Sequence, residues 1–197
     1  MRQETITREY RTFEELNESE KQAALDEYRD FNVSDSFWHE CAYEDAKTIG
    51  ALIGFNIDRI YFSGFWSQGD GACFEGDLTY AKNCVKSVKE YAPKDTELHG
   101  IAQAWADLQK RYFYRITATV KHSGHYQHEY CTAFDVWHGD EYASADVEES
   151  VQEIARDFMR WIYGRLESDY EYYTSDECVA ESLIANEVEF ESEREAA

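Results

Sequence analysis

Three of the six histidines fall within seven residues, in the segment KHSGHYQH. If this segment turns near His125, a hairpin places His122 opposite His128 on one face, and two imidazoles across a strand pair can bind a transition metal. A stable site needs a third or fourth ligand, and the candidates nearby are Glu129, His138 and Asp140. A solvated polar turn has the same composition, so we expect no resident metal or cofactor.

A second segment, SGFWSQGDGACFEGD, combines four glycines with two adjacent aromatic residues and three acids. It has neither the lysine and spacing of a phosphate-binding loop nor the register of an EF-hand. Glycine in such a segment supplies turns with positive φ. Phe65 and Trp66 then either cap the core or, together with Asp70, form an exposed surface for a partner.

The chain contains no complete catalytic signature. There is no G-x-S-x-G nucleophile elbow, and no cysteine lies in a recognisable catalytic neighbourhood. Cys131 is close to His128 in the sequence, but such a spacing arises by chance, and so do pairs of carboxylates among 41 acidic residues. We therefore expect a protein that is not an enzyme, with a metal-dependent enzyme centred on the histidine segment as an alternative.

Charge is the strongest compositional signal. The chain has 41 Asp and Glu against 19 Lys and Arg, a formal net charge of −22, and residues 140–197 hold 18 acids and 4 bases, or −14. Such a charge repels phosphates and anionic membrane surfaces. We expect no direct binding of nucleic acid or membrane, and a partner protein with a basic surface instead.

Many of these acids fall on predicted helices near the C-terminus, around apolar stripes. A rigid array of carboxylates can imitate the phosphates of DNA and occupy the basic cleft of a nucleic-acid enzyme. The alternative is a solvated face that only maintains solubility. The residues of this predicted acidic face are Glu148, Glu149, Glu153, Asp157, Glu167, Asp169, Glu171, Asp176, Glu177 and Glu181.

The elements that carry these residues predict an α+β fold. Alternating apolar residues indicate antiparallel hairpins at about 55–80 and 112–137, and residues at three- and four-residue spacing indicate several helices that pack on the sheet. The last helices, about 146–169 and 174–186, form an acidic helical part. No linker or repeat interrupts the chain, so we expect one domain over 1–190 and a frayed acidic tail over 191–197.

The five cysteines are widely spaced and form no C-x-x-C pair, which is typical of reduced thiols. The N-terminal residues have no apolar signal core, and no segment approaches the roughly 18 apolar residues of a membrane span. We expect a cytoplasmic protein, and its oligomeric state does not follow from the sequence.

Three segments, FEELNESEKQAALDEYRD, YEDAKTIGALIGFNIDRIYFSGFWSQGDGACFEGD and YEYYTSDECVAESLIANEVEF, resemble a widespread family of small acidic proteins of phages and prophages, sometimes described as antitoxin-like. The resemblance implies a phage setting, and hence the cytoplasm of an infected bacterial host, but it transfers no site. We expect a non-enzymatic inhibitor of a host nucleic-acid-processing or defence complex that acts by nucleic-acid mimicry. The alternative is an antitoxin-like or regulatory module that grips one protein through Phe65 and Trp66.

Overall fold

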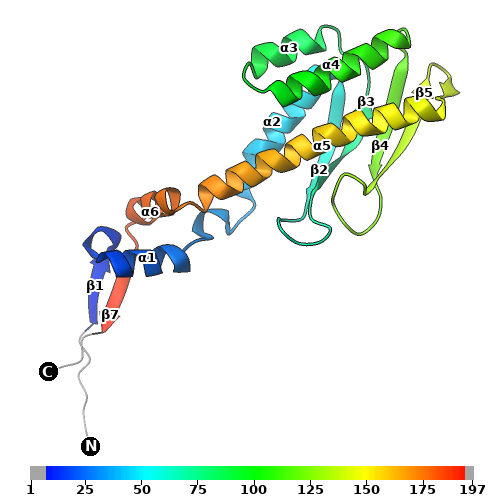
Figure 1. Ribbon diagram of the computed structural model, residues 1–197. Helices are drawn as coiled ribbons and strands as arrows, with labels where there is room; N and C mark the ends of the chain where they lie inside the picture. The colour runs from blue at the N-terminus through cyan, green and yellow to red at the C-terminus, as the bar shows by residue number, and fades with distance from the viewer. Residues whose placement is uncertain (1–7, 194–197) are drawn as a thin grey trace, which may run out of the picture. The chain divides into compact units, whose positions relative to one another are not determined.

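The computed structural model describes residues 8–193, which divide into two compact units. We call residues 1–38 and 168–197 the terminal unit and residues 39–167 the central unit. The sequence contains no linker at either boundary, which explains why one domain was expected there. Helices and antiparallel strands occur in both units (Figure 1), so the predicted α+β class is confirmed.

The central unit contains a five-stranded antiparallel sheet in the order β2-β3-β4-β5-β6. The strands are β2 (Phe55–Phe62), β3 (Ala72–Leu78), β4 (Ile116–His122), β5 (Thr132–His138) and β6 (Glu141–Tyr142). Both predicted hairpins are present, since β2 pairs with β3 and β4 with β5. β2 contains a bulge between Ile57 and Arg59, and Gly76 lies opposite it. A Cβ on Gly76 would come 2.0 Å from the carbonyl oxygen of Asn56, so only glycine fits there.

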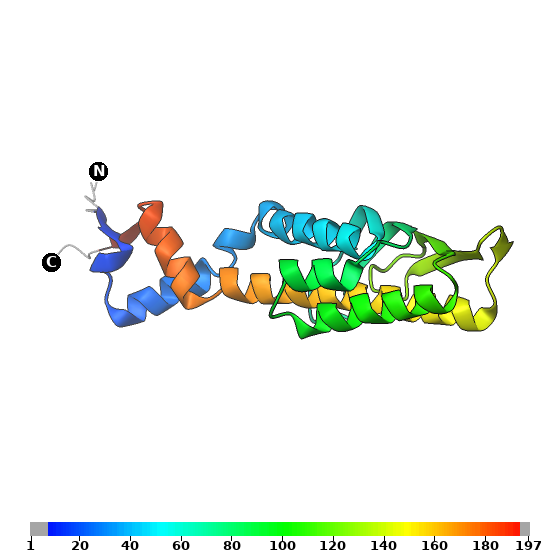
Figure 2. The same ribbon diagram turned by 90° about the horizontal axis from the view of Figure 1, so that it is seen from above.

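One face of this sheet is covered by helices α2 (Phe37–Ile53), α4 (Thr96–Arg111) and α5 (Ala145–Tyr173), and α3 (Cys84–Tyr91) packs beside α4. The ring of Phe55 lies 5.2 Å from that of Trp105 on α4 and 5.7 Å from that of Phe158 on α5. On the same sheet face, Phe62 contacts His39 of α2 and Tyr163 of α5. Figures 1 and 2 show α5 running across the strands with α4 beside it.

The other face of the sheet is mostly exposed and polar. Side chains alternate along a strand, so Ile116, Ala118 and Val120 point into the core, while Thr117 and Lys121 point away from it. Two aromatic stacks join residues of different strands. Tyr61 stacks on His122 at 4.3 Å between ring centroids, and Trp137 stacks on Tyr142 at 4.0 Å.

The terminal unit joins segments from the two ends of the chain. It contains β1 (Arg8–Thr12), the short helix η1 (Phe13–Glu15), α1 (Glu18–Glu27), the short helix η2 (Phe31–Val33), α6 (Asp176–Ala185) and β7 (Glu189–Glu193). β1 and β7 pair as a two-stranded antiparallel sheet, with Thr12 opposite Glu189. Its core consists of Phe13, Leu16, Ala24, Leu25, Val179 and Leu183.

Polar side chains cap three of the helices. Asn17 caps α1 and forms a capping box with Glu20, and Asp95 caps α4. The cap of α6 is Ser175, whose side chain accepts from the N–H of Cys178. The preceding residue, Thr174, donates its hydroxyl to the carbonyl of Tyr170.

Two predictions need correction. The second hairpin does not turn tightly at His125, because β4 ends at His122 and β5 begins at Thr132, leaving loop 123–131 between them. The frayed tail predicted from residue 191 is wrong for residues 191–193, whose backbone belongs to β7 and pairs with β1. Residues 194–197 of that tail lie outside the described residues.

Candidate functional site

The predicted acidic face is divided between the two units. Glu148, Glu149, Glu153, Asp157 and Glu167 belong to the central unit, and Asp169, Glu171, Asp176, Glu177 and Glu181 belong to the terminal unit. All ten lie on α5 or α6, as the sequence indicated.

In the central unit, Glu149, Glu153 and Asp157 follow one another at four-residue spacing along α5, so they share a solvent-facing stripe. Asp157 forms an ion pair with Arg160, whose guanidinium also reaches Glu129 at 3.4 Å. Arg160 continues the same stripe, and it interrupts the negative charge. A helix rises 1.5 Å per residue, so the stripe carries one carboxylate per about 6 Å, well below the charge density of duplex DNA.

In the terminal unit, Asp176 has a structural contact. Arg29 donates to Asp176, to Asp26 and to the carbonyl oxygen of Thr174, which ties α1 to the start of α6. The hydrogen bond to Asp176 is the largest cause that raises the pKa of Arg29. Glu171, Glu177 and Glu181 are exposed.

The charge itself is unequally divided between the units. The terminal unit has 20 acidic and 6 basic residues, a net −14, and the larger central unit has 21 acidic and 13 basic residues, a net −8. The terminal unit thus has most of the excess in about a third of the residues. Some of its acidic residues lie in β1, η1 and α1, outside the C-terminal helices in which the acidic face was predicted.

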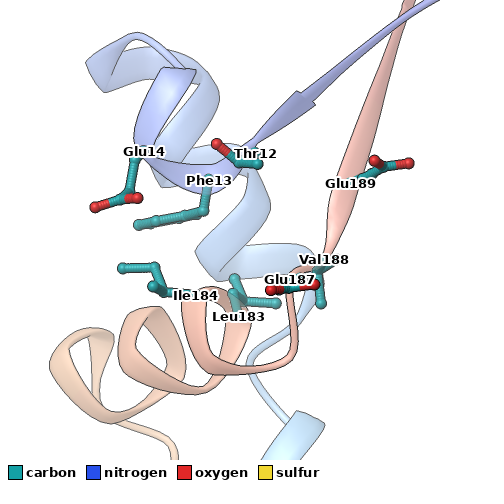
Figure 3. Close-up of a pocket in the computed structure, with 8 residues that line it drawn as sticks. All are labelled: Thr12, Phe13, Glu14, Leu183, Ile184, Glu187, Val188 and Glu189. Carbon is teal, nitrogen blue, oxygen red and sulfur yellow. The ribbon is translucent and has the colours of Figure 1, made fainter.

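A pocket of about 360 Å³ opens in the terminal unit between η1, the end of α6 and the start of β7 (Figure 3). Its apolar lining consists of Phe13, Leu183, Ile184 and Val188. Phe13 and Leu183 are buried core residues, whereas Ile184 is 44% exposed. Figure 3 shows Phe13 and Ile184 on opposite sides of the opening.

Among the described residues that line this pocket, the charged ones are all acidic, namely Glu14, Glu187 and Glu189. All three carboxylate residues are exposed. Glu187 follows the C-cap of α6 in the left-handed backbone conformation, with φ +50°, where glycine is usual. The two sides of this pocket lie some 170 residues apart in the chain, so no local sequence pattern predicts it.

The aromatic loop, residues 63–71, contains one buried and one exposed aromatic residue. Phe65 is buried, with its ring 5.0 Å from that of Phe62 and 5.3 Å from that of Tyr163. Trp66 is 73% exposed and has a left-handed backbone, with φ +68°. Asp70 accepts a hydrogen bond from the N–H of Ser67 at 2.8 Å, which closes the turn. Only Trp66 of the three predicted loop residues is presented outward.

The structure also brings this loop against loop 123–131, a contact that the sequence did not predict. A Cβ on Gly71 would come 2.6 Å from Cα and Cβ of His128, and one on Gly69 would come 2.4 Å from the ring of Tyr126. Tyr126 and Tyr130 are exposed. We call these two segments the loop pair, and its exposed aromatic residues are Trp66, Tyr126 and Tyr130.

The histidines do not face one another as expected. His122 lies opposite Thr132, and its Nε2 is 2.9 Å from the carbonyl oxygen of Tyr126. The prediction that His122 lies opposite His128 is wrong, because nine residues separate β4 from β5. Within residues 8–193, no group of three or more His, Cys, Asp or Glu side chains is placed to hold a metal ion.

His128 and Cys131, whose proximity in the sequence was attributed to chance, do touch. The sulfur of Cys131 lies 3.4 Å from Nε2 and 3.8 Å from Nδ1 of His128. Because the two distances are similar, the sulfur does not lie along the lone pair of either nitrogen. In addition, Nδ1 accepts the N–H of Tyr130 at 3.2 Å, which leaves the proton of a neutral ring on Nε2. His128 is therefore not oriented to take a proton from the thiol.

Residues 38–176 match DUF8835, a domain of unknown function. The chain belongs to this family. The DUF8835 match includes the whole central unit. It leaves out β1, η1, α1, β7 and nearly all of α6, so the pocket in Figure 3 lies outside the matched residues.

Beyond DUF8835, neither a curated protein nor a solved structure matches the chain. Across residues 8–193, every helix is too short or too polar to cross a lipid bilayer. The family match and the geometry of the terminal unit are therefore the observations on which a function can be proposed.

Proposed function

We propose that this protein is a non-enzymatic binding protein whose terminal unit holds a partner protein with a basic surface. The observation that carries the proposal is the net charge of −14 on the terminal unit. Charge of this density attracts a basic surface at long range and raises the association rate. Because it repels phosphates, a nucleic acid is the wrong partner for it.

Ion pairs within the terminal unit include those of Glu18, Glu20, Asp26, Asp176 and Glu191. Because the unit has 20 acidic and 6 basic residues, its own cations cannot neutralise most of its negative charge. Glu14, Glu187 and Glu189 surround the pocket and are exposed. An ion pair that stays exposed to water contributes little free energy, whereas one that is desolvated at an interface contributes more. These exposed carboxylates can therefore gain free energy by pairing with Lys or Arg of a partner protein.

The resemblance to acidic phage proteins extends the proposal to a biological role. In that role the protein is made in the cytoplasm of an infected bacterium and inhibits a host nucleic-acid-processing or defence complex by covering its basic surface. Nucleic-acid mimicry by the stripe on α5 receives less support, since Arg160 interrupts the stripe and pairs with Asp157. The terminal unit is the better candidate for the inhibitory surface.

Charge reversal tests the proposal. The tagged protein is used to capture partners from a bacterial lysate at 0.05 and 0.5 M salt, and variants with Lys at Glu171, Glu177 and Glu181 are compared with variants with Lys at Glu148, Glu149 and Glu153. We expect the partner to be lost at high salt, because the screening length, about 10 Å at 0.1 M, becomes shorter as salt is added. We expect it to be lost with the terminal-unit reversal and retained with the central-unit reversal, because the proposed contact is with the terminal unit. A partner retained under all these conditions would show that charge on the terminal unit does not hold it.

A second candidate function rests on the loop pair. Trp66, Tyr126 and Tyr130 are 73%, 53% and 65% exposed, and exposed aromatic residues are typical hot spots of protein interfaces. An antitoxin-like or regulatory module that grips its partner here binds through apolar contacts, which salt screens little. A partner that survives 0.5 M salt and is lost with Trp66→Ala would favour this function over the acidic one.

A further inference from the structure

The pocket of the terminal unit has a specific chemistry at its floor and at its rim. Phe13, Leu183, Val188 and Ile184 give an apolar floor and wall, and Ile184 stays 44% exposed beside it. The volume of about 360 Å³ is within the range of ligand pockets and more than twice that of a cavity that holds benzene. One large apolar side chain therefore fits.

The charge of the rim restricts which peptide can place an apolar side chain in the pocket. Glu14 comes from η1, and Glu187 and Glu189 come from the segment after α6, so carboxylates approach the opening from two elements. A peptide with acidic residues beside its apolar side chain would be repelled, and a neutral one would desolvate carboxylates without pairing them. A peptide with Lys or Arg on each side of the apolar residue fits both parts of the pocket. Its cations pair with the carboxylates of the rim, and its apolar side chain packs on the floor.

We propose that this pocket binds a basic segment of a partner protein in which one large aliphatic side chain, flanked by lysine or arginine, is the anchor. The aliphatic side chain packs between Phe13 and Ile184, and the flanking cations pair with Glu14, Glu187 and Glu189. This inference rests on the proposed function and gives the partner a recognisable sequence pattern. It also assigns the contact to a part of the chain that lies outside DUF8835.

Peptide binding tests the pattern on the full chain. The probes are fluorescein-labelled KKGLGKK, the same peptide with Ala in place of Leu, and the same peptide with every Lys replaced by Glu, measured by fluorescence anisotropy at 0.05 M salt. We expect the Leu peptide to bind about tenfold more tightly than the Ala peptide, as burial of a leucine side chain predicts, and the Glu peptide not to bind.

Variants separate the floor from the rim. Ile184→Gln keeps a good helix former at an exposed position, and we expect it to abolish the preference for Leu while the Ala peptide binds as before. The triple variant Glu14→Gln, Glu187→Gln, Glu189→Gln should weaken both Lys peptides at least tenfold. Its matched control removes three carboxylates on α5 of the central unit, Glu148→Gln, Glu149→Gln and Glu153→Gln, and should weaken them much less.

The outcomes distinguish this inference from the proposed function. Equal binding of the Leu and Ala peptides, or equal effects of the two triple variants, would overturn the pocket and leave a diffuse acidic surface as the binding site. If none of the peptides binds, the inference about the pocket is also wrong. The proposed function is then decided by the lysate experiment alone. If sedimentation instead detects a dimer that Ile184→Gln dissociates, a second copy of this chain is the occupant and the inference is wrong.

Discussion

Single residues on the open face of the sheet are more constrained than their exposure suggests. Glu75 accepts the hydroxyl of Tyr61 at 2.8 Å and the backbone N–H of His122 at 3.0 Å, and so links β2, β3 and β4. The ring of Tyr61 in turn stacks on His122 and contacts the guanidinium of Arg59. The hydrogen bond from Tyr61, followed by the one from His122, lowers the pKa of Glu75 below its ordinary value of 4.5.

This lowered pKa predicts a pH dependence of stability. A carboxylate whose pKa is lower in the folded state stabilises the fold above its ordinary pKa, and the contribution is lost as pH falls through the folded value. We expect Glu75→Gln to be less stable than the parent at pH 7, and the difference in unfolding free energy to shrink as pH falls below about 4.5. Urea denaturation at several pH values measures it. The control is Asp58→Asn on β2, and a pH-independent difference for Glu75→Gln would contradict the prediction.

At the scale of elements, the contact between the two loops depends on glycine. Loop 63–71 and loop 123–131 approach so closely that Gly71 has no room for a side chain beside His128. This contact presents Trp66, Tyr126 and Tyr130 as one loop pair, where the sequence offered an aromatic loop and a histidine hairpin as separate candidates. The cause is tertiary, because β3 pairs with both β2 and β4.

Two alanine substitutions of glycine should therefore have opposite effects. Gly71→Ala places a methyl group 2.6 Å from His128, and we expect it to destabilise the protein by roughly 1–3 kcal/mol and to expose the loops to proteolysis. Gly100→Ala lies within α4, where a Cβ meets nothing within 4 Å, and should stabilise by about 1 kcal/mol. Thermal denaturation and limited proteolysis measure both, and a neutral Gly71→Ala would mean that the loops separate at little cost.

For the whole molecule, the uneven charge is the dominant feature. The terminal unit has a net −14 and only a small core, whereas the central unit has a net −8 and a core shared by a sheet and several helices. Self-repulsion opposes folding of the terminal unit, and ion pairs such as Arg11 with Glu20 and Arg29 with Asp176 support it. Salt weakens both the repulsion among the acidic residues and the attraction within the ion pairs. The repulsion is the larger of the two, because the acidic residues of this unit far outnumber its basic residues.

We therefore expect added salt to stabilise the terminal unit selectively. Raising NaCl from 0.05 to 0.5 M should increase amide protection in α1, α6 and the β1–β7 pair more than in β3 and β4, because screening removes more repulsion than attraction. Hydrogen exchange followed by mass spectrometry at both salt concentrations measures this. Lower protection of α1 and α6 at high salt would show that the ion pairs outweigh the repulsion.

The sequence by itself determined the features that depend on neighbouring residues. The caps at Asn17 and Asp95, both hairpins and the apolar stripe of α5 involve contacts within a few residues or one strand connection, so their residue types are readable in order. Net charge is likewise a sum that needs no coordinates. The same local rules failed at loop 123–131, where contacts with Gly69 and Gly71 rather than turn residues set the path of the chain.

Only the tertiary structure decided how these parts combine. The pairing of β1 with β7 brings Phe13 and Glu14 next to Ile184 and Glu187, and no periodicity links residues so far apart. The division of the acidic residues between two units, and the pairing of Arg160 with Glu129, also follow from packing rather than composition. The pocket is built from segments that are distant in the sequence, and which side chains are buried or exposed there depends on which elements pack together. That packing is a property of the complete fold and not of any local pattern of residues.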